Sequence, residues 1–300
     1  MFQEYPPGAL IRNGERTYAV EARIARGKLG YFFSCRDDEG APRILQVLWP
    51  FSRSYENVRE RWIEQAGELR QLDHPGLLAL FDGFEHEGCF HLVHEPGERR
   101  LDHELASPGW DGRRALLDVA GPLLGALDAA HRAGHTHRNL HPRNVFRGAS
   151  GGPFKLGDLA ADTLLGKVDV LNTKISRWLV PPEYLSPTEC GPMDHRVDIY
   201  QAGLLLLCIL QGRVSQYSFE EIALGVPAKA TQGLATDYGE IGEILARALR
   251  PKVAERFESA MELWDALGRA SPSTSPSPEV VADRPRRRAS RRAGRNAGAP

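Results

Sequence analysis

Few cysteines and no long apolar segment occur in this sequence, and these absences exclude several classes of protein. None of the cysteines stands in CxxC spacing, so neither a zinc ribbon nor the disulfide framework of a small secreted domain is indicated, and we expect reduced, buried thiols. The four are Cys35, Cys89, Cys190 and Cys208. The longest apolar run, Ala202–Leu210, is far shorter than the ~18–20 residues that span a bilayer. Because the N-terminus also lacks a basic-then-apolar signal, we expect a cytoplasmic protein.

The composition is that of a globular protein followed by a segment of a different kind. With 300 residues, 42% hydrophobic and 26% charged, the chain can bury the core of one large or two modest domains. The net charge of −1 conceals an asymmetry, because residues 279–300 hold seven arginines and two acidic residues. From about Ser271 the chain is rich in Ser, Pro and Arg without an apolar period, which predicts disorder.

Two kinds of secondary structure divide the rest of the chain. Strand patterns dominate up to about residue 95, and one helical stripe at residues 55–72 includes the polar Gln65 among apolar residues. Longer helical patterns follow beyond Pro96. The expected strands cover 17–25, 31–37, 43–49 and 89–95, and the expected later helices cover 113–134, 197–212, 238–249 and 259–270.

Nine short motifs follow one another in an order that resembles the eukaryotic-type Ser/Thr protein kinase family, over roughly residues 18–267. The first four are "ARGKLGYF" for the glycine-rich loop, "ILQVL" for the lysine strand, "LDHPGLL" after the first helix, and "HLVHEP" for the hinge. The next are "HRNLHPRN" for the catalytic loop, "KLGDLA" for the metal-binding aspartate and "PPEYL" for the end of the activation segment. "DHRVDIYQAG" and "RPKVAERF" complete the series. The resemblance implies a two-lobed α+β fold.

The residues that the resemblance assigns to phosphate binding are altered. The family's strand lysine corresponds to Gln46, and its helix glutamate corresponds to Gln65. Two amides can form a hydrogen bond without carrying charge, so we expect Gln46 and Gln65 to bond directly and to lose the electrostatic clamp on phosphate. In the glycine-rich loop, Ala25 replaces the first glycine and Phe32 replaces a small β-branched residue.

Only part of the family's nucleotide cleft is expected to be retained. The resemblance assigns Gly27, Gly30 and Glu95 to it. We expect the methyl group of Ala25 to restrict approach to the phosphates and the ring of Phe32 to fill part of the base pocket.

The catalytic loop carries the change with the largest chemical consequence. In "HRNLHPRN" the family's proton-accepting aspartate corresponds to Asn139, and the lysine after it corresponds to His141. An amide does not accept a proton near neutral pH, and general-base assistance is worth about 10²–10⁴-fold in rate. The resemblance retains Asn144 and Asp158 as oxygen ligands that could hold Mg²⁺.

The remaining motifs imply scaffold roles. Glu183 is expected to pair with Arg256, and Asp198 is expected to hold the backbone of the catalytic loop. The departures from the family's pattern are therefore concentrated at the positions that take part in phosphate chemistry, which favours a protein that keeps the fold but lacks the activity.

Three other functions are compatible with parts of the sequence. One is an unusual, weakly active ATP-dependent Ser/Thr protein kinase in which Lys28 reaches the phosphates. Another is a zinc site, for which the candidate ligands are His131, His135, His137 and His141. This reading is disfavoured because Gly134 interrupts the helix between the first two histidines. The third concerns the basic tail, which could contact anionic surfaces or serve only solubility; without interleaved aromatics, it offers no specific reading of nucleic acid.

The sequence therefore predicts a pseudokinase, which is a catalytically inactive protein-kinase-like domain that acts as a binding, scaffolding or regulatory module. We expect an antiparallel β-rich N-lobe with one helix over 1–96, an α-helical C-lobe over 97–268 and a disordered tail over 269–300. No cofactor is required, and ATP with Mg²⁺ is expected to bind weakly or not at all. The protein partner is not specified by any motif, and no transmembrane segment is expected.

Overall fold

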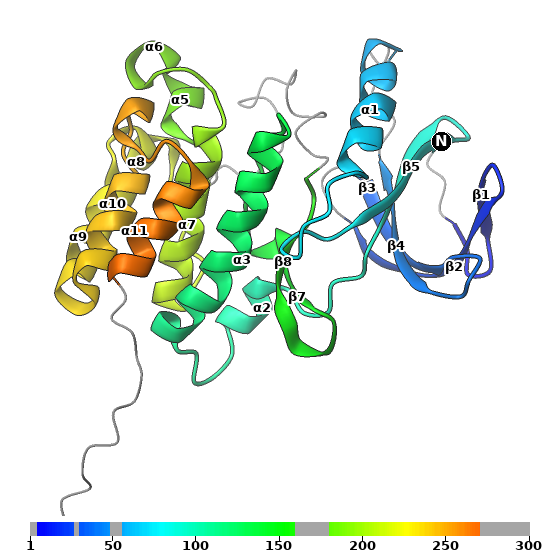
Figure 1. Ribbon diagram of the computed structural model, residues 1–300, viewed down its shortest axis with the longest axis horizontal. Coiled ribbons are helices and arrows are strands. Elements are labelled where there is room, and N and C mark those ends of the chain that lie inside the picture. Colours follow the sequence, from blue (N-terminus) through cyan, green and yellow to red (C-terminus); the bar gives the residue numbers. More distant parts are fainter. Residues whose placement is uncertain (1–4, 27–29, 49–55, 160–179, 271–300) are drawn as a thin grey trace, which may run out of the picture.

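The computed structural model describes residues 5–26, 30–48, 56–159 and 180–270, arranged as a β-rich lobe and a helical lobe (Figure 1). The first lobe is a six-stranded antiparallel sheet in the order β1-β2-β3-β4-β6-β5, with helix α1 beside it. Its strands are β1 Leu10–Asn13, β2 Arg16–Arg26, β3 Gly30–Arg36, β4 Pro42–Leu48, β5 Leu80–His86 and β6 Cys89–His94, and α1 covers Glu56–Leu69.

Strand β4 is buried on both sides, because each of its faces packs against a different hydrophobic cluster. Leu45 and Val47 point to one face, where they pack with an aromatic cluster that includes Phe33. Leu48 points to the opposite face and packs with Ala66 and Leu69 of α1. Since side chains alternate along a strand, Gln46 shares the α1 face with Leu48.

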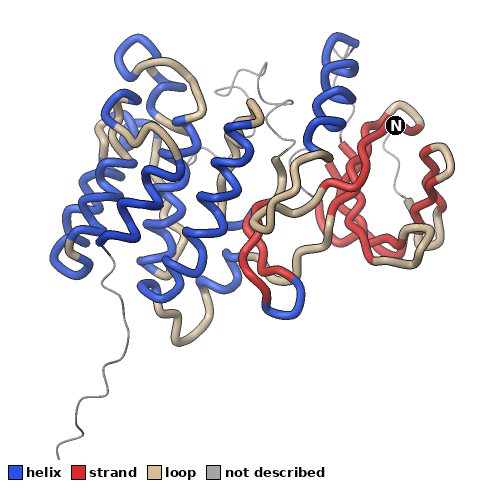
Figure 2. The backbone as a smooth tube through the Cα atoms, viewed as in Figure 1, coloured by secondary structure: helices blue, strands red, loops and turns tan. Residues whose placement is uncertain are grey.

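The second lobe is built on long helices and a two-stranded hairpin, and its separation from the sheet is clear in Figure 2. The longer helices are α3 Gly112–Arg132, α7 Arg196–Gln211, α9 Val226–Tyr238, α10 Glu240–Ala248 and α11 Ala260–Ala270. The hairpin strands are β7 Val145–Gly148 and β8 Gly152–Leu156. Short helices are α2 Leu101–Leu105, α5 Pro182–Leu185, α6 Pro187–Cys190 and α8 Phe219–Ala223, with 3₁₀ turns at Pro142–Asn144, Ala149–Gly151 and Val253–Glu255.

Helix α7 accounts for the longest apolar run of the sequence. Every residue from Val197 to Leu210 is buried, because one side of α7 packs on α3 while Leu204 and Leu207 pack with Leu249 on another side. A continuous apolar run is expected for a helix that is buried all round. Among the described residues, no helix combines the length and apolarity that a membrane span needs.

The predicted two-lobed α+β architecture is confirmed, and the predicted long elements are all present. Strands β1, β5, β7 and β8 were not predicted, nor were α2, α5, α6, α8 and most of α9. All four cysteines are free as expected, but Cys190 is partly exposed, so the prediction of buried thiols is wrong there.

Candidate functional site

The loop between α3 and the 3₁₀ turn at Pro142–Asn144 is fixed from the start of α7. The buried carboxylate of Asp198 accepts hydrogen bonds from the backbone N–H groups of His137 and Arg138, each at 2.7 Å. His131 Nε2 lies 2.8 Å from the same carboxylate. Although burial disfavours the charged form, the contact with His131 and these backbone bonds hold the pKa of Asp198 below its usual value. The predicted anchoring role of Asp198 is confirmed.

Three of the predicted site residues meet where this loop approaches the end of β8. Asn139 Nδ2 donates to Asp158 Oδ2 at 2.8 Å. Asn144 Nδ2 donates to the backbone oxygen of Asn139 at 2.8 Å and lies 3.4 Å from Asp158 Oδ2. Gly157 N–H donates to the Asn144 carbonyl at 2.7 Å, which ties β8 to the loop. The geometry therefore brings Asn139, Asn144 and Asp158 into one polar cluster.

Asp158 is held in an unfavourable environment for a carboxylate. Its backbone has a φ of 65°, a left-handed conformation that Asp and Asn tolerate better than most residues. Burial raises the pKa of Asp158, while interactions with His137, Asn139 and Gln46 partly offset that effect. A full cation in place of the amides would stabilise the carboxylate more strongly.

The residues predicted to hold Mg²⁺ fit that ion in their chemistry. Mg²⁺ is bound by oxygen, and Asp158 supplies a carboxylate. Because the Nδ2 of Asn144 is used by the Asn139 carbonyl, the amide oxygen of Asn144 is the atom left to act as a ligand. Asn144 and Asp158 would therefore hold the ion, and its charge would neutralise bound phosphate.

The predicted bond between Gln46 and Gln65 is replaced by other partners. Gln46 is 2% exposed, and its Oε1 lies 3.1 Å from His94 Nε2 at the end of β6. Burial lowers the pKa of His94 to about 4, so this ring is neutral and its Nε2–H donates to Gln46. The Gln46 amide also lies close enough to Asp158 to lower the pKa of that carboxyl. The contact of Gln46 with His94 thus replaces the expected pair.

Gln65 faces the helical lobe through a histidine that precedes the fixed loop. Its Nε2 lies 3.3 Å from His135 Nδ1, and Glu68 Oε2 lies 3.6 Å from His135 Nε2. His135 is buried and is anchored by its own backbone N–H, which donates to Ala130 O at 2.9 Å. Helix α1 is therefore joined through Gln65 to the second lobe. The prediction of a bond between Gln46 and Gln65 is wrong because an amide can bond to whichever partner the backbone brings near it.

The other altered positions, Ala25 and Phe32, lie in the hairpin formed by β2 and β3. Ala25 pairs with Phe32, and Phe32 pairs with Gln46, so the Phe32 ring lies on the face that carries Gln46. Gly30 has a structural role in addition to the one expected, because a Cβ atom there would lie 1.9 Å from the Val47 carbonyl oxygen. Gly27 lies outside the described residues, as does Lys28.

Two more predicted residues have defined side-chain contacts. Glu95 pairs with Lys155 Nζ at 2.7 and 2.8 Å and accepts a hydrogen bond from Ala79 N–H at 3.2 Å. Its carboxylate therefore holds the segment after β6 to β8. His141 is buried and its Nδ1 accepts from Arg143 N–H at 2.9 Å, which caps the 3₁₀ turn. This contact gives His141 a structural task that does not need a proton transfer.

The four histidines considered for zinc have separate partners. His131 contacts Asp198, His135 contacts α1, His137 Nε2 lies 2.8 Å from the Gly157 carbonyl, and His141 caps its turn. Within the described parts of the chain, no group of three or more His, Cys, Asp or Glu side chains is arranged to hold a metal ion.

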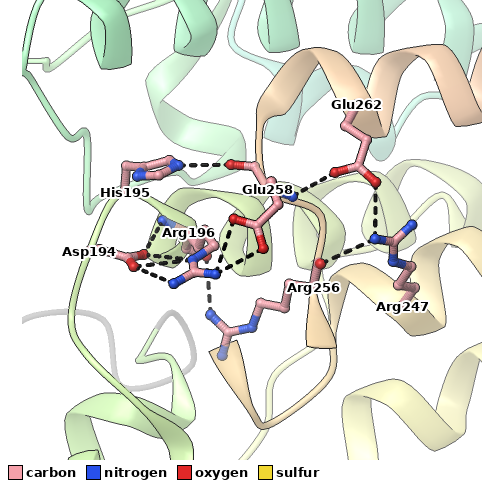
Figure 3. A network of polar contacts seen from close by, with 7 residues as sticks. All are labelled: Asp194, His195, Arg196, Arg247, Arg256, Glu258 and Glu262. Carbon is pink, nitrogen blue, oxygen red and sulfur yellow. Dashed lines mark hydrogen bonds and ion pairs between the residues drawn. The ribbon is translucent and has the colours of Figure 1, made fainter. Parts of the chain in front are cut away.

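The end of the activation segment is anchored as predicted. Arg256 donates to Glu183 through Nη1 at 2.7 Å and Nη2 at 2.6 Å, and both side chains are fully buried. Figure 3 shows the polar network around Arg256, in which Arg196 contacts Asp194 and Glu258. This network fixes the start of α7 to the segment before α11.

Two contributors to the site, His94 and Lys155, were missed in the sequence, and His135 was considered only as a zinc ligand. His94 directly precedes Glu95 in "HLVHEP", and His135 stands two residues before His137, so both lie next to motif residues. Their partners could not be predicted, because each lies on an element distant in sequence.

Comparison with known proteins adds an independent result. The model of the family described as "Protein kinase domain" matches residues 18–231. The Serine/threonine-protein kinase pkn2 of Myxococcus xanthus is 28% identical over 284 residues, which cover 90% of this chain and 34% of pkn2. PknL of Mycobacterium tuberculosis is 26% identical over 257 residues, covering 82% of this chain and 63% of PknL. The chain thus spans about a third of the first relative and under two thirds of the second.

The solved structures support the fold in the same way. The Mycobacterium tuberculosis PknI kinase domain superposes with a TM-score of 0.68 at 20% identity, and the match covers 89% of this chain and all of that domain. At this identity the likeness concerns the fold. Because the family model matches well over half of the sequence, the chain belongs to the protein kinase domain family.

Proposed function

We propose that this protein kinase domain is a binding or scaffolding module without phosphotransfer activity, a pseudokinase. The observation that carries the proposal is the contact of Asn139 Nδ2 with Asp158 at 2.8 Å. The residue in the proton-accepting position is a neutral amide that donates to a carboxylate, so it supplies no general base.

The surroundings of Gln46 support the same proposal. Phosphoryl transfer depends on fixed positive charge at the phosphates, because there is little covalent chemistry for the protein to perform. At this position the chain provides an amide bonded to His94, whose low pKa keeps it uncharged. No cofactor is required for a binding role, and we expect ATP with Mg²⁺ to bind weakly through Asn144 and Asp158.

Two measurements test the proposal. The purified protein should transfer no radiolabelled phosphate from ATP to itself or to generic substrates above the level of an Asp158→Ala variant. A thermal-shift titration with ATP and Mg²⁺ should give little rise in melting temperature at micromolar nucleotide, since a ligand that binds the folded state stabilises it by mass action. Robust transfer that disappears in Asp158→Ala would overturn the proposal.

A second candidate is a weakly active, unusual Ser/Thr protein kinase. It is favoured by the relatives, which carry the name of Ser/Thr protein kinases, and by the retained pair Asn144 and Asp158. Slow transfer that requires Mg²⁺ and is lost in Asn144→Ala as well as in Asp158→Ala would support this candidate and exclude the first.

The partner is a protein whose identity no motif defines. The basic tail could contact anionic surfaces, and any such contact should weaken steeply with salt. The expected cytoplasmic location stays a prediction that imaging of a tagged full-length chain would check.

A further inference from the structure

The carboxylate of Asp82, in β5, is buried and bonded by uncharged donors. Its Oδ2 accepts hydrogen bonds from the Tyr18 hydroxyl at 2.8 Å and from Asn13 Nδ2 at 3.0 Å, and its Oδ1 accepts from Gly83 N–H at 3.0 Å. Burial and the bond to Asp82 raise the pKa of Tyr18, so its hydroxyl stays a donor. The carboxylate therefore does not depend on a cation for its hydrogen bonds.

Two arginines lie against this carboxylate beyond hydrogen-bond distance. Arg16 Nη1 lies 3.7 Å from Asp82 Oδ2, and Arg70 Nη1 lies 3.7 Å from Asp82 Oδ1. Arg16 donates to the Phe81 carbonyl at 3.2 Å, whereas the Arg70 side chain donates to no group in the part of the chain that the structure describes. The two side chains are 51% and 38% exposed, so N–H groups of both are accessible to a ligand.

The local charges do not cancel at this place. Among the described residues, Asp82 is the one acid within ion-pair distance of either guanidinium. The acids of the β3–β4 turn have other partners, since Asp37 pairs with Arg43 at 2.7 Å and Asp38 accepts from Thr17 N–H. Two guanidinium groups thus share one carboxylate, and one positive charge is left uncompensated.

An exposed face of α1 adjoins these arginines. Ile63, Gly67 and Arg70 are spaced by four and three residues, which places them on one side of the helix, and Arg70 N–H continues the helical bonding to Ala66 O at 3.1 Å. Ile63 is 43% exposed, and a Cβ atom at Gly67 would meet nothing within 4 Å. This face therefore offers an apolar side chain two turns, or roughly 10 Å, from a guanidinium, with open space between them.

We propose that this face of α1, together with Arg16, binds an acidic segment of a protein partner. An aspartate or glutamate of the segment bonds to the guanidinium groups, since these bind carboxylates through charge-assisted hydrogen bonds, and an apolar residue of the segment packs on Ile63. A monoanion balances the uncompensated charge, whereas a phosphate with about −1.5 to −2 charges would place excess negative charge beside Asp82. The inference rests on the proposed function in that it gives the binding module a class of partner, and it uses none of the residues of the candidate site.

The test is a titration of the full chain with short peptides, followed by ¹H–¹⁵N NMR at constant ionic strength. Residues three apart in an extended peptide span about 10 Å, so the probes are the blocked tetrapeptides Leu-Ser-Ser-Glu and Glu-Ser-Ser-Leu, which cover both chain directions. We expect saturable shifts of Arg16, Gly67 and Arg70 with at least one of them in the millimolar range, as suits so small a ligand. Glutamine in place of glutamate should abolish saturable binding, and phosphoserine there should bind no more tightly than glutamate.

Arg16→Gln and Arg70→Gln should each weaken binding about threefold to fivefold, because each removes an exposed charge–charge contact. The matched control is Arg36→Gln, which removes the same charge from an arginine that is 54% exposed and already pairs with Glu21 at 2.7 Å. Ile63→Ser should weaken binding of the leucine peptide and leave unchanged the binding of a peptide with serine in place of leucine. Melting curves of all variants check that the fold is intact.

Several results would overturn the site: no saturable shift with either peptide, equal binding of the glutamine peptide, tighter binding of the phosphoserine peptide, or equal weakening by Arg36→Gln. Phosphotransfer measured on the same samples is a separate result. Activity would overturn the proposed function and leave this site intact, whereas an inactive protein that binds neither peptide would overturn the site alone.

Discussion

At the scale of single residues, Asp158 is the point where the replaced side chains converge. Asn139 and Asn144 both direct amide groups toward this one carboxylate, and Gln46 also lowers its pKa. Burial nevertheless raises the pKa of Asp158, because its surroundings compensate a buried charge less well than a paired cation would. Substitutions at Asp158 and Gln46 therefore report directly on the electrostatics of the cluster.

Asp158→Asn should raise the melting temperature at neutral pH. The folded-state pKa of Asp158 lies above the unfolded value, so the folded state favours the protonated carboxyl, and the cost of the carboxylate is present above the folded pKa and absent below the unfolded one. Asparagine removes that charge and tolerates the φ of 65°. Thermal unfolding at several pH values should show the gain shrinking toward about pH 4, the usual value for aspartate. A variant less stable than wild type by the same margin at every pH would contradict this account.

Gln46→Lys should cost less stability than the sequence alone predicts. Opposite an amide, a buried lysine would be an uncompensated charge with a cost of ~3–5 kcal/mol. The structure instead places Asp158 beside Gln46, so the new ammonium group gains a carboxylate partner. Denaturant unfolding should show strong coupling of Gln46→Lys with Asp158→Asn and little coupling with Gln65→Glu, the matched control. Phosphotransfer should stay absent until Asn139→Asp is added.

At the scale of elements, helix α1 takes its polar contact from the helical lobe. His135 reaches both Gln65 and Glu68, which lie one turn apart on α1. We interpret His135 as the tether that positions α1 relative to the fixed loop.

His135→Leu should therefore loosen α1 selectively. Removing a buried hydrogen-bonding partner should speed amide exchange in the second half of α1 about threefold to tenfold, while exchange in α10 and α11 stays unchanged. His103→Leu is the control, because His103 is exposed and contacts Arg100 within its own segment. Gln65→Leu should produce the same change in α1, and combining it with His135→Leu should add little. Additive effects of the two variants would show that these side chains are not coupled.

At the scale of the whole molecule, the second lobe is held together by a buried ion pair and by exposed pairs around it. Glu183 and Arg256 are fully buried, whereas 71% of the Glu258 side chain is exposed in its contact with Arg196 (Figure 3). Exposed ion pairs contribute little, while removing one partner of a buried pair leaves an uncompensated charge. The two contacts therefore differ in their effect on folding although they belong to neighbouring parts of one network.

Glu183→Gln should reduce the free energy of unfolding by ~3–5 kcal/mol. Its control, Glu258→Gln, should cost at most about 1 kcal/mol. Urea unfolding of both variants checks the difference. Similar losses for the two would mean that burial of Glu183 and Arg256 does not control the strength of their pairing.

Removal of residues 271–300 should leave the melting temperature of the remaining chain unchanged. The reason lies in the sequence, since this segment offers no periodic apolar residues for a core. A loss of several degrees on truncation would show that the segment packs against the lobes.

The two lobes and the residues that stabilise them could be predicted from the sequence, because the patterns that indicate them are local. Alternation and helical periodicity predicted the long elements, and motif order placed Asp198, Glu183 and Arg256 in roles that the contacts confirm. Short strands such as β1 and β7 were not predicted, because a few residues carry too little periodicity to be distinguished from a loop. The identities of Gln46 and Asn139 also follow from the sequence, and with them the absence of charge at those positions.

The partners of those residues were decided only by the tertiary structure. An amide can donate or accept in almost any direction, so nothing in the sequence distinguishes Gln65 as a partner of Gln46 from Gln65 as a partner of His135. Local pattern determined which residues are buried and which charges are missing, while the packing of elements distant in sequence determined what each polar group meets.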